Sequence, residues 1–84
     1  MSQIVFTSHA KEKILERGTT TEEVKDVILH GEQIPAKHGR TALRKNFQYN
    51  SKWGGNFYHI KQVLAITKKE NHHICVITVY TFYF

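Results

Sequence analysis

The hydrophobic periodicity of the chain changes once, near Gly31, and this change limits the folds that the chain can adopt. Before Gly31, apolar residues recur at spacings of three and four in two short segments, which is the period of an α-helix. After Gly31, β-branched and aromatic residues form runs that are typical of strands. Because 84 residues leave no room for a second unit, we predict a single α+β domain spanning residues 1–84.

Two short helices are expected before the change of period. The first is predicted between Ser8, which suits the N-cap, and Gly18, which suits the position after the last turn. The second is predicted to open at Thr20 and Glu23, which have the spacing of a capping box, and to end at Gly31. A tight turn separates the two helices.

Four strands are expected after the change of period. The predicted strands lie at Ile34 and at residues 41–49, 57–67 and 74–82, with turns or loops at 37–40, 51–56 and 69–72. Residues 4–6 are either a very short strand or an extended lead-in. The expected architecture is therefore α+β, with two N-terminal helices packed on a curved four-stranded antiparallel sheet.

Three side chains that suit phosphate chemistry are spaced four residues apart in the first helix. His9, Lys13 and Arg17 recur at i, i+4 and i+8, so a helix places them on one face. A titratable imidazole beside fixed positive charge is what a site for phosphate chemistry needs. These three are candidate catalytic residues, with His9 as general base or acid. The alternative is a solvated basic face without a site.

Two hydroxyl-bearing side chains lie close together in the last predicted strand. Thr78 and Tyr80 are two residues apart, so both project from one face of the strand, together with Phe82. Their hydroxyls could serve one site, and Thr78 and Tyr80 are therefore further catalytic candidates. Thr and Tyr are also favoured in strands for packing alone, and that alternative stays open.

Cations and aromatic rings are mixed around the predicted turn at residues 37–40 and the strands after it. Arg40 and Arg44 share a face of an extended strand, so their guanidinium groups could clamp an anion, whereas Lys45 points to the other face. With Tyr58, they are candidate RNA-binding residues, because bases stack on rings and phosphates pair with cations. Solvated arginines beside core aromatics are the alternative explanation.

Charge is distributed unevenly along the chain, whose formal net charge is +5. Residues 1–32 hold six of the seven acidic residues and four of the twelve Lys and Arg, whereas residues 33–84 hold eight Lys and Arg and one acid, Glu70. A segment of this charge attracts polyanions, and nucleic acid is the usual one. RNA is therefore an expected partner.

Several classes of site find no support in the sequence. The six histidines lack metal-binding spacing, and no glycine-rich phosphate loop or nucleophile elbow occurs, so we expect neither a metal nor a cofactor. Cys75 is the single cysteine and excludes an intrachain disulfide, which fits a reducing cytoplasm. Residues 1–6 are unlike a signal peptide, and no stretch approaches 18 apolar residues, so we expect a cytoplasmic protein without membrane contact.

The order of three motifs resembles that of a family of small bacterial and phage proteins of unknown function. The motifs are H-A-K-E-K-I-L-E-R-G from His9, T-T-E-E-V from Thr20 and V-I-T-V-Y from Val76. The family pattern is H-A-x-x-R-x-x-x-R-G, an acidic opening of the second helix and a closing V-x-T-V-Y. That family is similar in architecture to the RelE and BrnT ribonuclease toxins of the barnase–EndoU–colicin–RelE group. The resemblance implies the two-helix, four-stranded architecture described above.

The same resemblance implies a metal-independent endoribonuclease, in which a 2′-hydroxyl attacks its own phosphate. His9 would move the proton, Arg17 and Lys13 would stabilise the extra phosphate charge, and Thr78 or Tyr80 would orient the phosphate. At the middle arginine of the family pattern this chain has Lys13, which keeps the charge but loses the bidentate fork.

The leading hypothesis is therefore a toxin-like ribonuclease that an antitoxin normally holds. The alternative is a non-catalytic binding module, for example a phage or mobile-element protein that binds a host protein or nucleic acid. Aromatic residues near Trp53 and at Tyr83 and Phe84 suit a docking patch or the edge of a homodimer. RNA binding without cleavage is a third hypothesis.

Overall fold

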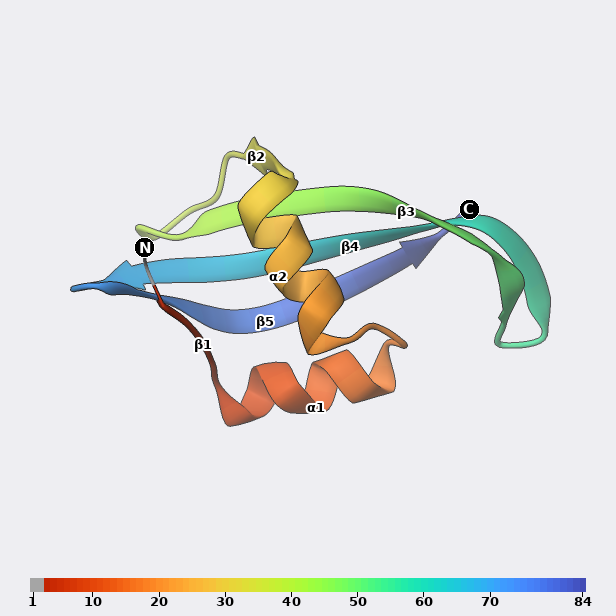
Figure 1. Cartoon of the computed structure of the whole chain (residues 1–84), viewed down its shortest axis with the longest axis horizontal. Coiled ribbons are helices and arrows are strands. Elements are labelled where there is room, and N and C mark those ends of the chain that lie inside the picture. Colours follow the sequence, from red (N-terminus) through yellow and green to blue (C-terminus); the bar gives the residue numbers. More distant parts are fainter. Residues whose placement is uncertain (1–2) are drawn as a thin grey trace.

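The computed structural model describes residues 3–84 and contains two helices and five strands (Figure 1). In chain order the elements are β1 (Gln3–Phe6), α1 (Ser8–Glu16), α2 (Thr21–His30), β2 (Glu32–Ile34), β3 (Thr41–Trp53), β4 (Asn56–Glu70) and β5 (His73–Tyr83). All five strands belong to one sheet, in the order β1-β5-β4-β3-β2. The α+β class with two helices is thus confirmed.

The sheet differs from the prediction by one strand and one direction. Strands β2 to β5 form the expected antiparallel meander, but β1 adds a fifth strand that runs parallel to β5. Ile4 pairs with Ile74 and Phe6 with Val76, so β1 covers only the first part of β5. The predicted four-stranded antiparallel sheet is therefore corrected to a five-stranded mixed sheet, because residues 4–6 pair with the free edge of the last strand.

Threonines begin both helices. The Thr7 hydroxyl accepts a hydrogen bond from the Ala10 amide at 3.0 Å, so Thr7 and not Ser8 is the N-cap of α1. The Thr20 hydroxyl accepts from the Glu23 amide at 3.1 Å, as the capping-box spacing predicts. The reciprocal bond of a capping box, from the Thr20 amide to the Glu23 carboxylate, is not formed, because this carboxylate accepts from two other side chains that are described below.

The two helices occupy different places on the sheet (Figure 1). Helix α2 crosses one face of the sheet over β3 and β4, whereas α1 runs alongside the outer edge of β5 beyond the end of β1. The core lies between the helices and that face; its buried members are Ala10, Ile14, Val24, Val27, Ile28, Val63, Ala65, Val76 and Val79. Within residues 3–84, the other face of the sheet carries no helix.

A bulge in β5 changes which face its side chains take. Thr67 pairs with Val76 and Ile66 with Thr78, so Ile77 is an extra residue in β5. Val76 and Val79 are both fully buried although they are three residues apart, because the bulge resets the alternation. Thr78 is thereby turned to the helix-free face.

The β3–β4 hairpin is longer than the sequence predicts. Trp53 pairs with Asn56, so the expected loop at 51–56 contracts to a turn at Gly54 and Gly55. Both glycines have positive φ angles, 59° and 88°, as a two-residue hairpin turn requires. The hairpin brings Trp53 onto the ring of Tyr83, stacked at a centroid distance of 5.0 Å.

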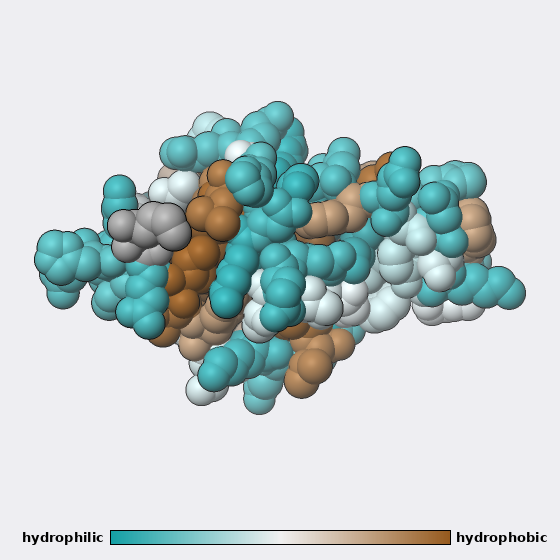
Figure 2. Space-filling model, in the orientation of Figure 1, coloured by the Kyte–Doolittle hydropathy of each residue, from teal (hydrophilic) through white to brown (hydrophobic). Residues whose placement is uncertain are grey.

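The face that bears α2 is mostly hydrophilic, with a hydrophobic strip at the end of the sheet near β1 (Figure 2). In this region, a groove of about 310 Å³ has Ile28, Leu43 and Ile74 among its lining residues. Within residues 3–84, neither helix has the length and apolar character that crossing a membrane requires.

Candidate active site at the edge of the last strand

Helix α1 closes the edge of β5 that β1 leaves open. The Thr7 amide donates to the Val76 carbonyl at 3.2 Å, and the Thr7 hydroxyl donates to the Ile77 carbonyl at 3.1 Å. Farther along the strand, Arg17 Nη1 donates to the Val79 carbonyl at 2.7 Å. An open strand edge would expose such carbonyls to pairing with another chain. Both ends of α1 are thus fixed to consecutive parts of β5.

His9 lies against the hydroxyl that the bulge turns outward. His9 Nε2 is 3.2 Å from Thr78 Oγ1, within hydrogen-bonding distance, and the imidazole is exposed to solvent. The hydroxyl can donate to the ring nitrogen or accept from it, depending on the tautomer. This contact gives the ring a fixed orientation while a ligand can still reach it, which a general acid or base requires.

Arg17 contacts β5 at the residues that follow the one contacted by His9. Its guanidinium carbon is 4.6 Å from the centroid of the Tyr80 ring, while Nη1 is held by the Val79 carbonyl. A guanidinium has five N–H donors, so those that the carbonyl does not use can bind an anion. The backbone of Arg17 is also fixed, because its carbonyl accepts from the Thr81 and Tyr83 hydroxyls at 2.9 and 2.7 Å.

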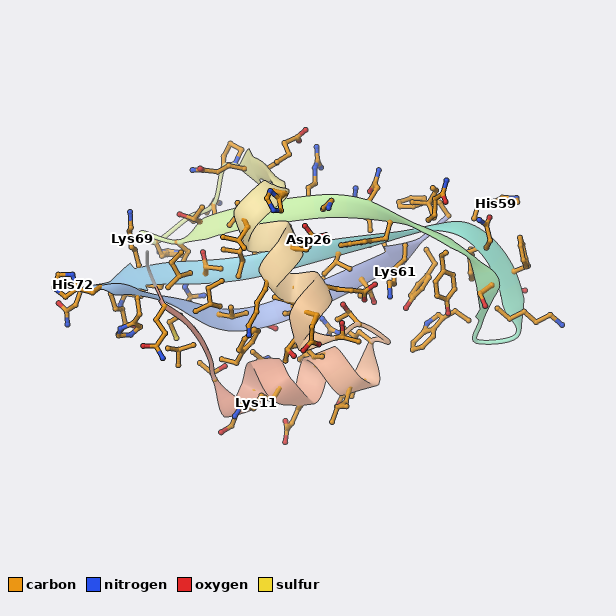
Figure 3. All side chains as sticks on the ribbon, viewed as in Figure 1. Lys11, Asp26, His59, Lys61, Lys69 and His72 are labelled. Atoms are coloured by element: carbon orange, nitrogen blue, oxygen red, sulfur yellow. The ribbon has the colours of Figure 1, made fainter. Side chains whose placement is uncertain are left out.

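Lys13 does not join this group. Its Nζ donates to Glu16 at 2.9 Å, and the hydrogen bond from Lys13 holds the pKa of the Glu16 carboxyl below its ordinary value. The helical row therefore divides: the side chains of His9 and Arg17 contact β5, whereas the middle residue forms an ion pair along the helix. Lys11, two residues before Lys13, points from α1 into solvent (Figure 3).

The candidate RNA-binding residues lie in different places. Arg44 is on the helix-free face, where the pairing register aligns it with Leu64 and Tyr80 in one cross-strand row. Lys45 is on the other face and donates to Asp26 of α2 at 2.6 Å. Arg40 lies in the loop before β3 and lines an open groove there.

Tyr58 packs within an aromatic cluster and not at the edge of β5. Its ring centroid is 5.6 Å from that of Tyr83, which also contacts Tyr49 and Trp53. This cluster covers the turn between α1 and α2, because Trp53 and Tyr83 lie against Gly18. The arrangement agrees with packing of core aromatics, the alternative explanation for Tyr58.

Some side chains that shape the site are not apparent from the sequence. Thr81 and Tyr83 hold the end of α1, and their alternation on the last strand is the one signal that could have indicated it. Phe82, the residue between them, lies on the helix-free face and is 44% exposed. The Val79 carbonyl that holds Arg17 has no sequence signature at all.

The assembled group contains an imidazole, a guanidinium, a hydroxyl and a phenol ring, from His9, Arg17, Thr78 and Tyr80 respectively. Such a set can transfer a proton and stabilise charge on a phosphate. Within the described part of the chain, no three side chains of His, Cys, Asp or Glu are grouped so that they could hold a metal ion.

Comparison with known proteins gives one match. The model of a family described as a domain of unknown function (DUF4258) matches residues 6–81, from the end of β1 to near the end of β5. No curated protein and no solved structure gives a significant match. The matched region includes both helices and every residue of the group at the β5 edge.

Proposed function

We propose from the site geometry that this chain, which belongs to the DUF4258 family, is a metal-independent endoribonuclease. The function of the family is unknown, so membership in it assigns no activity. The substrate is RNA, and the nucleophile is the 2′-hydroxyl next to the cleaved phosphate. The activity would be toxin-like, in the cytoplasm, in the manner of the RelE and BrnT ribonucleases that the motifs resemble.

His9 and Arg17 have separate roles in this reaction. His9 accepts the proton as the 2′-oxygen forms its bond to phosphorus. Arg17 stabilises the additional negative charge on the phosphoryl oxygens. The bond from phosphorus to the 5′-oxygen then breaks, and that oxygen takes a proton from the Tyr80 hydroxyl or from water. The products are a 2′,3′-cyclic phosphate and a 5′-hydroxyl.

One observation carries this proposal: His9 and Arg17 contact β5 within three residues of each other, at Thr78 and at Val79 and Tyr80. Two short contacts to a rigid strand hold the proton-transfer group and the cation near one another, and such preorganisation is how a site stabilises a transition state. Lys13 would contribute only after leaving Glu16.

The test is cleavage of a 5′-labelled single-stranded RNA by the purified protein in the presence of a chelator. We expect fragments that end in 2′,3′-cyclic phosphate, and loss of more than 100-fold of the rate in His9→Ala, since general acid–base catalysis contributes about 10²–10⁴-fold. The matched control is His72→Ala, an exposed histidine in the turn between β4 and β5, which should cleave normally. Equal cleavage by the wild type and His9→Ala would contradict the proposal.

A binding module without catalysis remains the second candidate function. Its support is the exposed apolar surface near the C-terminus, where Phe82 and Phe84 are 44% and 64% exposed. Such rings suit contact with an antitoxin, a host protein or a second copy of the chain. A complex that forms equally well with His9→Ala and Arg17→Ala, from a protein that leaves RNA intact, would favour this function.

A further inference from the structure

We infer that the helix-free face of the sheet binds a base of single-stranded RNA, with Phe82 as the stacking surface and Gln62 and Asn46 as the groups that recognise the base. This inference rests on the proposed function, because it supplies the substrate contact beside the cleavage site. None of these three residues belongs to the group at the β5 edge.

The pairing register places the three residues side by side. Asn46 of β3 pairs with Gln62 of β4, which pairs with Phe82 of β5. The row is adjacent to the one that contains Arg44, Leu64 and Tyr80. Within β5, residues two apart on one face lie about 7 Å from each other along the strand. Phe82 is therefore the first side chain on this face beyond Tyr80.

Exposure favours stacking at this row. Phe82 is 44% exposed and Tyr80 is 40% exposed, in the part of β5 that lies beyond β1 and has β4 as its neighbouring strand on one side only. No helix covers this face, and successive bases of a single strand stack on such rings. A base in a duplex already has stacking partners, so the occupant is single-stranded.

The amide groups beside Phe82 have the chemistry that recognises a base edge. Gln62 Nε2 donates to Asn46 Oδ1 at 2.9 Å, and this bond holds both amides in place. Each amide keeps a donor and an acceptor for a ligand, and amides of Asn and Gln bind the adjacent donor and acceptor of a base. A ring that stacks on Phe82 brings its edge toward these groups.

Charge on the same face agrees with an RNA strand. Arg17 lies over Tyr80, and Arg44 lies at the β3 end of the adjacent row. Arg44 donates through Nε and Nη2 to one oxygen of Glu32, which leaves its Nη1 group to a phosphate. Cations at both ends of this adjacent row fit phosphates on either side of a base that is bound at the next row.

The experiment measures binding without cleavage. Fluorescent 10-mers of A, C, G or U with 2′-O-methyl groups lack the nucleophile, and their dissociation constants are measured by anisotropy at low salt. We expect the wild type to favour one base by 5-fold or more. Phe82→Ala should weaken binding of every 10-mer by about 5- to 100-fold, Phe82→Tyr should restore it, and Gln62→Leu should remove the preference among bases.

The matched control is Phe57→Ala. Phe57 is 54% exposed in the hairpin between β3 and β4, and this variant should bind like the wild type. Circular dichroism melting of each variant separates loss of binding from loss of folding. If Phe82→Ala and Gln62→Leu bind all four 10-mers like the wild type, the inference is overturned even when RNA is still cleaved.

Two other outcomes separate the inference from the proposed function. Binding with the expected pattern by a protein that never cleaves natural RNA would support the base site and refute the ribonuclease. If Phe82→Ala alters only sedimentation, by dissociating a dimer, then the face is an interface between two copies and the inference is overturned.

Discussion

Arg17 combines a structural contact with a proposed catalytic role in one side chain. Its Nη1 group donates to the Val79 carbonyl at the edge of β5, and the guanidinium lies over the Tyr80 ring. The two roles need different properties. The hydrogen bond needs one donor, whereas the phosphate needs several donors in a planar fork. Substitutions at this residue can therefore separate stability from activity.

Arg17→Ala should lower the free energy of unfolding by about 1.5–3 kcal/mol, the range for a hydrogen bond that involves a charged group. Arg17→Lys should retain most of this stability, because an ammonium can still reach the carbonyl, but should lose RNA cleavage by 10-fold or more. Urea unfolding and cleavage rates measure the two effects. Lys11→Ala, on the solvent side of α1, is the control and should change neither. Wild-type cleavage by Arg17→Lys would exclude a role for the fork.

Gly18 is the second residue whose effect the structure defines. It has a φ angle of 74°, and a Cβ there would lie 2.7 Å from Trp53 Cη2 and 2.8 Å from Tyr83 Oη. Gly18→Ala should therefore cost about 2–5 kcal/mol, the sum of a left-handed backbone and an overpacked contact. Gly54→Ala is the matched control: its φ is also positive, at 59°, but no atom lies within 4 Å. Equal costs in thermal unfolding would show that the aromatic cluster does not pack on this turn.

At the scale of elements, a partly buried ion pair joins the turn between the helices to the sheet. Lys61 of β4 is 6% exposed, and its Nζ donates to Glu23 at 2.7 Å and to the Gly18 carbonyl at 3.0 Å (Figure 3). Glu23 also accepts from the Thr19 hydroxyl. The capping-box spacing correctly predicted that Glu23 lies at the start of the helix. Its carboxylate, however, binds Lys61 of the sheet.

Removing the two partners of this pair should have unequal effects. Glu23→Gln leaves the Lys61 ammonium buried without a counter-charge and should cost about 2–4 kcal/mol. Lys61→Met should cost less, because the Glu23 carboxylate is 26% exposed and water can solvate it. The double variant Glu23→Leu and Lys61→Met should be more stable than Glu23→Leu alone. Urea unfolding of the set checks the order, and additive costs would show that the two groups do not interact.

The contact of β5 with the end of α1 should make stability fall in alkaline solution. Burial raises the pKa of the Tyr83 phenol above 10.0, and its hydroxyl donates to the Arg17 carbonyl only while protonated. The unfolded chain therefore loses this proton first as the pH rises. The contribution of Tyr83 is complete below about pH 10 and is lost as the pH rises through the folded pKa.

Comparison of the wild type with Tyr83→Phe isolates this effect from other groups that titrate at high pH. The difference in their unfolding free energies should be constant from pH 7 to 9 and shrink above pH 10. Ultraviolet titration at the tyrosinate band gives the pKa directly. A difference that stays constant to pH 11 would show that the phenol is not held in its neutral form.

The helices were predictable from sequence because their signals are local. Capping threonines and glycines lie within a few residues of the turns that they fix. A short strand at residues 4–6 is one of two alternatives that the sequence leaves open, and its place in the sheet is not predictable, since these residues gain their partner from β5, about 70 residues away. The β3–β4 hairpin is longer than predicted because Ser51 and Lys52 are polar and therefore resemble loop residues in the sequence. The exposed end of a hairpin can pair without an apolar pattern.

At the scale of the whole molecule, the sequence predicted where the candidate site lies better than it predicted which side chains form it. Helical spacing placed His9 and Arg17 on one face, and strand alternation placed Thr78 with Tyr80, but neither could show that Lys13 turns to Glu16. The bulge at Ile77 determines the face of the sheet on which Thr78 lies, and no local sequence pattern predicts this bulge. Arg44 lies on the helix-free face, as Tyr80 does, whereas Lys45, its neighbour in sequence, lies on the face covered by α2.

The division of the sheet into a covered and an open face predicts how salt affects RNA binding. The logarithm of the binding constant should fall linearly with the logarithm of salt concentration, by about 0.7 for each phosphate contact with a single strand. Arg44→Gln removes one such contact on the open face and should make the slope shallower by about 0.7. Its ion pair with Glu32 is exposed, so the fold should tolerate the change.

Lys25→Gln is the control, because it removes the same charge from an exposed position on α2, over the other face. Its slope should equal that of the wild type, since a cation on the covered face releases no counterion from the RNA. Anisotropy titrations of the 2′-O-methyl 10-mers from 20 to about 200 mM salt give all three slopes. If both variants reduce the slope equally, binding follows net charge alone, and the open face has no special part in it.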